Sequence, residues 1–316
     1  MVDRQLSFKE EKISEILNTV IGKLKSGDFE ESVVLLEKAL SMDFEYPGVS
    51  SSLKSTKFWK DRKDKYENLP DITSRGEYLL NQWETYTIFS FNMMDIPEDV
   101  DFSIKSWVFS NALSDFKKLL DETNRYDTSL LLKLGKCYKG IGNYDNAIAI
   151  LEEANRIDIL NPEIIAELAD CYALIDEVKM SKVFFREAFF ADPQAVHITT
   201  MESSLIKKLV RKLSDMGMQL NEIKEWLPVY GNIWGVFNIK RELKPLELGK
   251  LKQSIYSYEK SIENGDEEPS VIPRLINRYF WLIDHYISTS EEQNKIDEIL
   301  QKIRELNSSI FEEYIN

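Results

Sequence analysis

The chain has 316 residues, of which 43% are hydrophobic and 30% charged, with only 12 Gly and 9 Pro. This composition favours packed helices joined by short turns over disorder or a β-sandwich. The formal net charge of -14 at pH 7 disfavours a DNA or RNA partner, because nucleic-acid affinity comes mainly from phosphate neutralisation by Lys and Arg.

Targeting signals and cysteines are both sparse. The first twelve residues, MVDRQLSFKEEK, lack the apolar core of a signal peptide, and the longest apolar stretch, 226–237, is interrupted by proline and glycine. Cys137 and Cys171 are too few for a disulfide framework. The sequence therefore predicts a cytoplasmic protein with reduced thiols and no membrane-spanning segment.

A helical hairpin is predicted within residues 13–46. Its centre, LKSGDFEESVVLLEKAL, places Gly27 between two apolar-periodic segments. Ser32, Leu36 and Ala39 follow at i, i+4 and i+7, which is one face of a helix. Gly27 can take the left-handed backbone that ends a helix, so we expect the turn there.

Further helices are expected by apolar periodicity, separated by turns rich in Pro, Gly and Asp. About two degenerate hairpins plus an insertion would fit residues 47–127. The remaining helices are predicted at 53–68, 75–93, 101–122, 198–213, 244–263, 270–288 and 291–314. In the segment 222–243, aromatic residues at i, i+4, i+8 and i+11 predict a helix with one aromatic face.

An internal repeat of 34 residues begins at residue 128. The superposed pairs keep size or polarity: Leu131 and Ile165, Leu134 and Leu168, Gly135 and Ala169, Cys137 and Cys171, Tyr138 and Tyr172, Ala147 and Ser181, Leu151 and Phe185, Ala154 and Ala188. A shift of 115 residues sets Gly27 on Gly142 and Ala39 on Ala154. Each copy thus predicts a hairpin of two helices whose small residues allow close packing.

The stretch LLLKLGKCYKGIGNYDNAIAILEEANRID resembles the tetratricopeptide repeat family. The matching positions are Gly135, Tyr138, Gly142, Tyr144, Ala147 and Ala154. The resemblance implies an all-α, right-handed solenoid of helical hairpins that binds other proteins and is not an enzyme. On this basis we divide the chain into an N-terminal hairpin at 1–46, degenerate hairpins at 47–127, two repeats at 128–195 and a helical C-terminal region at 196–316.

Two aromatic blocks, the first made of two segments, carry a second, weaker resemblance. FWKDR, RGEYLLNQW and PRLINRYFWLIDHY resemble segments of spirochaete tetratricopeptide proteins, some of which are scaffold parts of the flagellar motor. The resemblance implies a bacterial scaffold or adaptor within a large assembly. Large aromatics at helical spacing are more often core than site, so these blocks identify no binding residue by themselves.

Chemistry-bearing clusters are lacking in the sequence. His197 and His285 belong to no paired motif, and no phosphate-binding loop occurs. We therefore expect no catalytic residue, no cofactor and no metal site. The alternative is an enzyme or ligand-responsive regulator with its site in the non-repeat helices. Two basic stretches, 54–65 and 203–213, are interpreted as solvated helix faces or local basic patches.

The predicted binding face lies on the inner helices, which line a groove in the family that the chain resembles. Its residues are Lys133, Lys136, Glu167 and Asp170. The 34-residue shift sets Lys133 against Glu167 and Lys136 against Asp170, so the four either pair with each other or present a bipolar groove to a ligand. We predict that this face is exposed and that a protein partner binds it.

Overall fold

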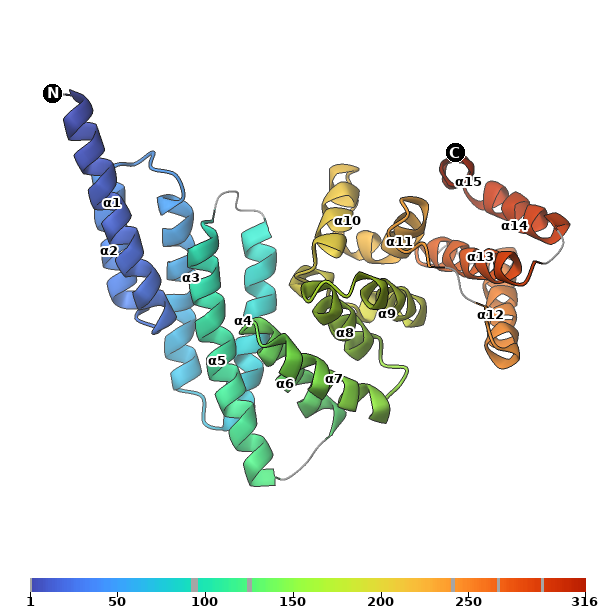
Figure 1. The fold of residues 1–316 in the computed structure, drawn as a ribbon, viewed down its shortest axis with the longest axis horizontal. Coiled ribbons are helices and arrows are strands. Elements are labelled where there is room, and N and C mark those ends of the chain that lie inside the picture. Colours follow the sequence, from blue (N-terminus) through green and yellow to red (C-terminus); the bar gives the residue numbers. More distant parts are fainter. Residues whose placement is uncertain (1, 92–95, 124–126, 240–241, 266–267, 291–292) are drawn as a thin grey trace. The chain divides into compact units, whose positions relative to one another are not determined.

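The computed structural model describes residues 2–91, 96–123, 127–239, 242–265, 268–290 and 293–316. Within these ranges the chain is all-α, as predicted, with no strand. It forms two compact units, 1–154 and 155–316. The division falls inside helix α7 (Figure 1). The four segments proposed from the sequence stay a prediction.

The first unit consists of antiparallel neighbouring helices (Figure 1). They are α1 (Val2–Lys25), α2 (Phe29–Met42), α3 (Val49–Glu67), α4 (Ile72–Phe91), α5 (Glu98–Thr123), α6 (Thr128–Gly140) and the first part of α7 (Tyr144–Ile157). Helix α5 packs against α1, α3, α4 and α6 and so occupies the centre of this unit.

The second unit begins with a hairpin and continues through shorter helices. They are α8 (Pro162–Leu174), α9 (Val178–Ala191), α10 (Ser204–Asp215), α11 (Leu220–Ile233), α12 (Pro245–Glu263), α13 (Val271–Ser288), α14 (Gln293–Leu306) and α15 (Ser308–Ile315). Two 3-10 turns, η1 (Pro193–Ala195) and η2 (Ile198–Thr200), join α9 to α10. Helix α13 packs against α9, α11, α12 and α14.

The three hairpins α1–α2, α6–α7 and α8–α9 turn in the same way. Gly27, Gly142 and Asp176 have φ angles of 79°, 80° and 62°, in the left-handed region. In each turn the next residue donates its N–H to the carbonyl five positions earlier, at 2.8, 2.9 and 2.9 Å. This closure is typical of the Schellman motif. The positions are those that the shifts of 115 and 34 residues set in register, so the predicted hairpin turns are confirmed.

The second helix of each hairpin buries the same three positions. All nine side chains at these positions are 0% exposed. They are the small residues Ser32, Ala147 and Ser181, the large residues Leu36, Leu151 and Phe185, and the alanines Ala39, Ala154 and Ala188. A Cβ on Gly135 would lie 2.5 Å from Leu151, so glycine is what allows α6 and α7 to approach. The predicted repeat register is therefore confirmed within the hairpins.

Asp176 provides a test of the shared turn. Replacing Asp176 with glycine should stabilise the protein by about 0.5–1 kcal/mol, because a left-handed backbone costs energy for any residue with a Cβ. Urea unfolding of the Asp176→Gly variant would measure this. A midpoint below that of the native protein would contradict the assigned turn geometry.

The aromatic blocks supply core, as predicted for large aromatics at helical spacing. In the first unit Trp59 and Trp83 are 0% and 7% exposed, and their rings lie 6.1 Å apart. In the second unit Tyr279 is 2% exposed. These rings stabilise each unit by burial, which explains their spacing without a ligand.

The segment 222–243 is not one aromatic helix. Helix α11 ends at Ile233, and Gly235 takes a φ of 71°. The chain then reverses so that Phe237 donates its N–H to the carbonyl of Gly231 at 2.8 Å. A Cβ on Gly231 would lie 2.4 Å from the Phe237 ring. The prediction of one aromatic helix was wrong because Gly231 leaves the space in which the Phe237 ring packs, and the chain turns back at Gly235.

Two other predicted helices also differ from the structure. The range 291–314 is broken at Asn307, whose side chain caps α15 by accepting the N–H of Ile310 at 3.0 Å. The range 198–213 begins with the 3-10 turn η2, and α10 starts only at Ser204. In the range 291–314 a capping residue divides the predicted helix in two. In the range 198–213 a short turn precedes it.

Candidate functional site

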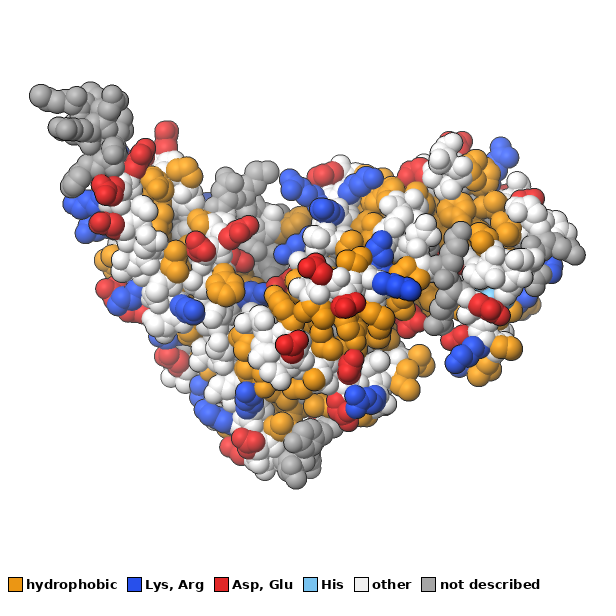
Figure 2. Space-filling model, viewed as in Figure 1, with side chains coloured by type: hydrophobic (Ala, Val, Ile, Leu, Met, Phe, Trp, Pro, Cys, Tyr) orange, Lys and Arg blue, Asp and Glu red, His pale blue; other side chains and the backbone are white. Residues whose placement is uncertain are grey.

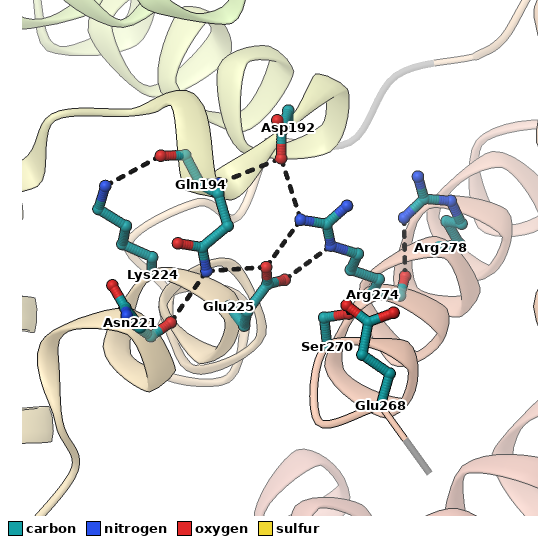
Figure 3. Close-up of polar contacts among 9 residues, drawn as sticks. All are labelled: Asp192, Gln194, Asn221, Lys224, Glu225, Glu268, Ser270, Arg274 and Arg278. Atoms are coloured by element: carbon teal, nitrogen blue, oxygen red, sulfur yellow. Dashed lines mark hydrogen bonds and ion pairs between the residues drawn. The ribbon is translucent and has the colours of Figure 1, made fainter. Parts of the chain in front are cut away.

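A convergent polar cluster in the second unit surrounds Glu225 of α11, which is 5% exposed (Figure 3). Arg274 of α13 donates to both of its carboxylate oxygens, Nε to Oε2 at 2.8 Å and Nη2 to Oε1 at 2.7 Å. Arg274 also donates to Asp192 at 3.0 Å, and Gln194 donates to Glu225 at 2.9 Å. The cluster thus joins the end of α9, the turn η1, α11 and α13.

The electrostatics of this cluster indicate a structural role. The hydrogen bonds that Arg274 donates to Glu225 raise the pKa of Arg274, and burial opposes that shift. Both oxygens of Glu225 accept hydrogen bonds from donors of the chain, so neither faces a position from which it could take a proton from a substrate. Lys224 adds a bond to the carbonyl of Gln194 at 2.9 Å. The arrangement fixes helices and offers no reacting centre.

A second buried ion pair joins α9 to α13. Arg186 donates to Asp284, and the residues are 5% and 6% exposed. Arg186 also donates to the carbonyl of Ile239, and its guanidinium lies 4.4 Å from the centre of the Trp281 ring. Sequence reasoning missed this pair. A charged residue inside an apolar helical run was the only signal for it.

The predicted binding face divides between the two units. Lys133 and Lys136, on α6, are partly exposed. Lys133 forms an ion pair with Glu77 of α4, a partner that the sequence did not suggest. Glu167 and Asp170 belong to the second unit. The pairing of the lysines with these acids stays a prediction.

The expectation that all four residues are exposed is wrong for the two acids. Glu167 is 1% and Asp170 0% exposed. The Asp170 carboxylate accepts the N–H groups of Glu202 and Ser203 at 2.9 and 2.8 Å. The reason is that the segment after the second repeat returns to α8 and places its backbone amides on Asp170, which therefore holds the start of α10.

Removing this carboxylate should be costly. We expect Asp170→Ala to lower the free energy of unfolding by about 2–3 kcal/mol, because two buried amides lose a charged acceptor. Asp170→Asn should lose less than half of that, since one oxygen can still accept from both amides. Chemical denaturation of the two variants measures the difference. Equal stability of all three proteins would show that Asp170 does not hold the segment.

The histidines and cysteines contact their own unit. His285 Nδ1 accepts the N–H of Leu243 at 3.1 Å, and His197 lies 3.6 Å from Glu163. Cys137 and Cys171 are buried, and burial raises the pKa of the Cys137 thiol. In the described ranges no group of three His, Cys, Asp or Glu side chains could hold a metal ion. The expected lack of a cofactor stays a prediction.

The basic stretch 54–65 lies on α3 and is largely neutralised. Lys57 pairs with Glu37 and Lys60 with Glu30, both at 2.8 Å, and Lys63 lies 3.5 Å from Glu67. Its interpretation as a solvated helix face therefore fits the structure. In the part of the chain that the structure describes, no helix is long and apolar enough to cross a membrane.

A comparison with protein families finds a match at one of the three hairpins. Residues 128–158 match the tetratricopeptide repeat. The match covers α6 and α7, where the glycine turn and the buried alanines lie. No curated protein matches the chain. A tetratricopeptide repeat indicates a role in protein–protein interaction, and this all-helical fold is typically non-enzymatic.

Proposed function

We propose that the chain is a non-enzymatic adaptor or scaffold that holds a partner protein against its helical hairpins. The observation that carries the proposal is the shared geometry of three hairpins, one of which matches the tetratricopeptide repeat. Stacked hairpins offer broad, rigid helix faces, which suit binding better than bond-making. Membership of a larger assembly, such as a flagellar motor, is a finer hypothesis that rests on the aromatic blocks alone.

The proposed contact face on the first unit is the part of α6 that carries Lys133 and Lys136. Their partial exposure supports this role. Glu167 and Asp170, in contrast, are buried, and we propose that they support the second hairpin rather than touch the partner directly.

Cross-linking with an amine-reactive reagent, followed by mass spectrometry of the captured complex, tests the proposal. Lys133 and Lys136 should form cross-links to the partner protein. Lys57 is the control, because it lies on α3, outside the proposed contact face, and should not form cross-links to the partner. Cross-links confined to α3, or a complex that contains no second protein, would contradict the proposed face.

Charge reversal gives a matched second test. Lys133→Glu should slow association with an electrostatically steered partner, but it also breaks the pair with Glu77. Combining Lys133→Glu with Glu77→Lys restores an ion pair with the two charges exchanged, and a partly exposed pair of this kind is worth about 1 kcal/mol. The double variant should therefore fold like the native protein and still bind more slowly if α6 contacts the partner.

A further inference from the structure

Helix α10 carries an exposed basic face. Lys207, Lys208, Arg211 and Lys212 are all exposed. Figure 2 shows blue side chains gathered over this helix. The helix rises about 1.5 Å per residue, so the four cations occupy a strip about 8 Å long. Four positive charges in so short a strip contrast with the chain's net charge of -14.

Three of these four cations differ from the paired lysines of α3. Within the described ranges no carboxylate lies at salt-bridge distance from Lys207, Lys208 or Arg211, whereas three lysines of α3 are paired. Asp215, the one acid of α10, lies a turn beyond Arg211 and does not pair with it. Lys212 covers the ring of Trp234, its Nζ 3.5 Å from the centroid.

Apart from the contact of Lys212 with Trp234, the spacing of these cations is unfavourable for the helix itself. Lys207 and Arg211, and likewise Lys208 and Lys212, are four residues apart, so like charges lie above each other on the helix surface. Such pairs destabilise a helix by about 0.2–0.5 kcal/mol each. A carboxylate at either position would remove the repulsion. The repulsion would be relieved by an anionic ligand.

We infer that this basic face of α10 is a docking surface for an acidic segment of the partner protein. This inference rests on the proposed function and adds that the partner segment that contacts α10 is acidic. Two to four carboxylates spaced along a helix or an extended strand would match the strip. Association would then be fast and sensitive to salt, because exposed charges steer encounter and are screened by ions.

Two other anionic partners fit the structure less well. A membrane-surface helix inserts its apolar face into the lipid, but Ile206, Leu209, Val210 and Leu213 are buried in the core of the second unit. A nucleic acid would extend well beyond the strip and meet a chain of net charge -14, which repels it.

The test measures binding of a short synthetic peptide that alternates Glu with Ala, with a Gln-for-Glu peptide as the control ligand. Fluorescence anisotropy at low salt should show binding of the acidic peptide alone. The combined variant Lys207→Gln, Lys208→Gln and Arg211→Gln should bind at least about tenfold more weakly, since three charged contacts are lost. Added salt should weaken binding to the native protein and affect this variant less.

A variant with the same change of net charge provides the control. Lys54→Gln, Lys57→Gln and Lys60→Gln alter α3 in the first unit and should leave the affinity within about twofold. Equal losses in both variants would show a general charge effect and overturn the assignment of α10. So would undiminished binding to the α10 variant, or no binding to the native protein.

Other occupants are outcomes that would also overturn it. These are stronger binding of α10 to vesicles of phosphatidylcholine and phosphatidylserine, stronger binding to a DNA duplex, or self-association that the α10 variant abolishes. Copurification of the partner distinguishes failure of the docking surface from failure of the proposed function. A partner that copurifies equally with the native protein and the α10 variant removes the docking surface and leaves the interaction role. The lack of any partner removes the proposed function.

Discussion

Ala188→Arg is expected to unfold the second unit, with a loss of about 4 kcal/mol or more. Ala188 is 0% exposed and belongs to the same hydrophobic core as Phe185 and Phe189. Arginine there would combine overpacking with burial of an unpaired charge, and both are destabilising. The loss is a large part of the 5–15 kcal/mol by which a typical domain is stable. Thermal unfolding followed by circular dichroism would measure it.

The same helix offers a control. Ala191 ends α9 and is exposed, so Ala191→Arg should change stability by no more than about 0.5 kcal/mol. Ala154→Arg, at the equivalent position of the preceding hairpin, should behave like Ala188→Arg because Ala154 is also 0% exposed. If Ala154→Arg and Ala188→Arg both unfolded at the same temperature as Ala191→Arg, the repeat register would be wrong.

Breaking the pair between Glu225 and Arg274 is the second large effect. Arg274→Met alone should cost about 3–5 kcal/mol, because it leaves the buried Glu225 without its charged partner. Glu225→Leu should cost less, because Arg274 keeps its ion pair with Asp192. The double variant should be considerably more stable than Arg274→Met alone, since the only carboxylate that then loses the arginine, Asp192, has a side chain that is 43% exposed to water. Urea unfolding of the four proteins in a double-mutant cycle gives the coupling energy.

An exposed pair shows the expected contrast. Lys57 and Glu37 have side chains about half exposed, and their pair should contribute at most about 1 kcal/mol. A coupling between Glu225 and Arg274 as small as that of the exposed pair would mean that the cluster in Figure 3 does not hold the helices together.

Local sequence signals predicted the hairpins well. The glycines at 27 and 142 mark two turns, and the structure places the third at Asp176, which the 34-residue shift aligns with Gly142. The buried alanines follow the same register. These features depend on contacts within one hairpin, so a pattern of a few tens of residues contains the necessary information.

The parts that failed depend on residues far apart in the sequence. Asp170 looked exposed because its helix alone was considered, whereas the amides of Glu202 and Ser203 cover it in the folded chain. Glu225 and Arg274 are also brought together only by the packing of α11 against α13. No local spacing predicts such pairs. The basic residues of α10 were visible, but their lack of partners could be seen only in the structure.

Native mass spectrometry of the chain, purified gently from the cells that produce it, tests the central claim most directly. The account predicts a complex of defined composition that contains at least one other protein. That complex should weaken as the salt concentration rises, because charged helix faces contribute to it. A chain found only alone or only with copies of itself, at low as well as high salt, would contradict a role in holding partner proteins.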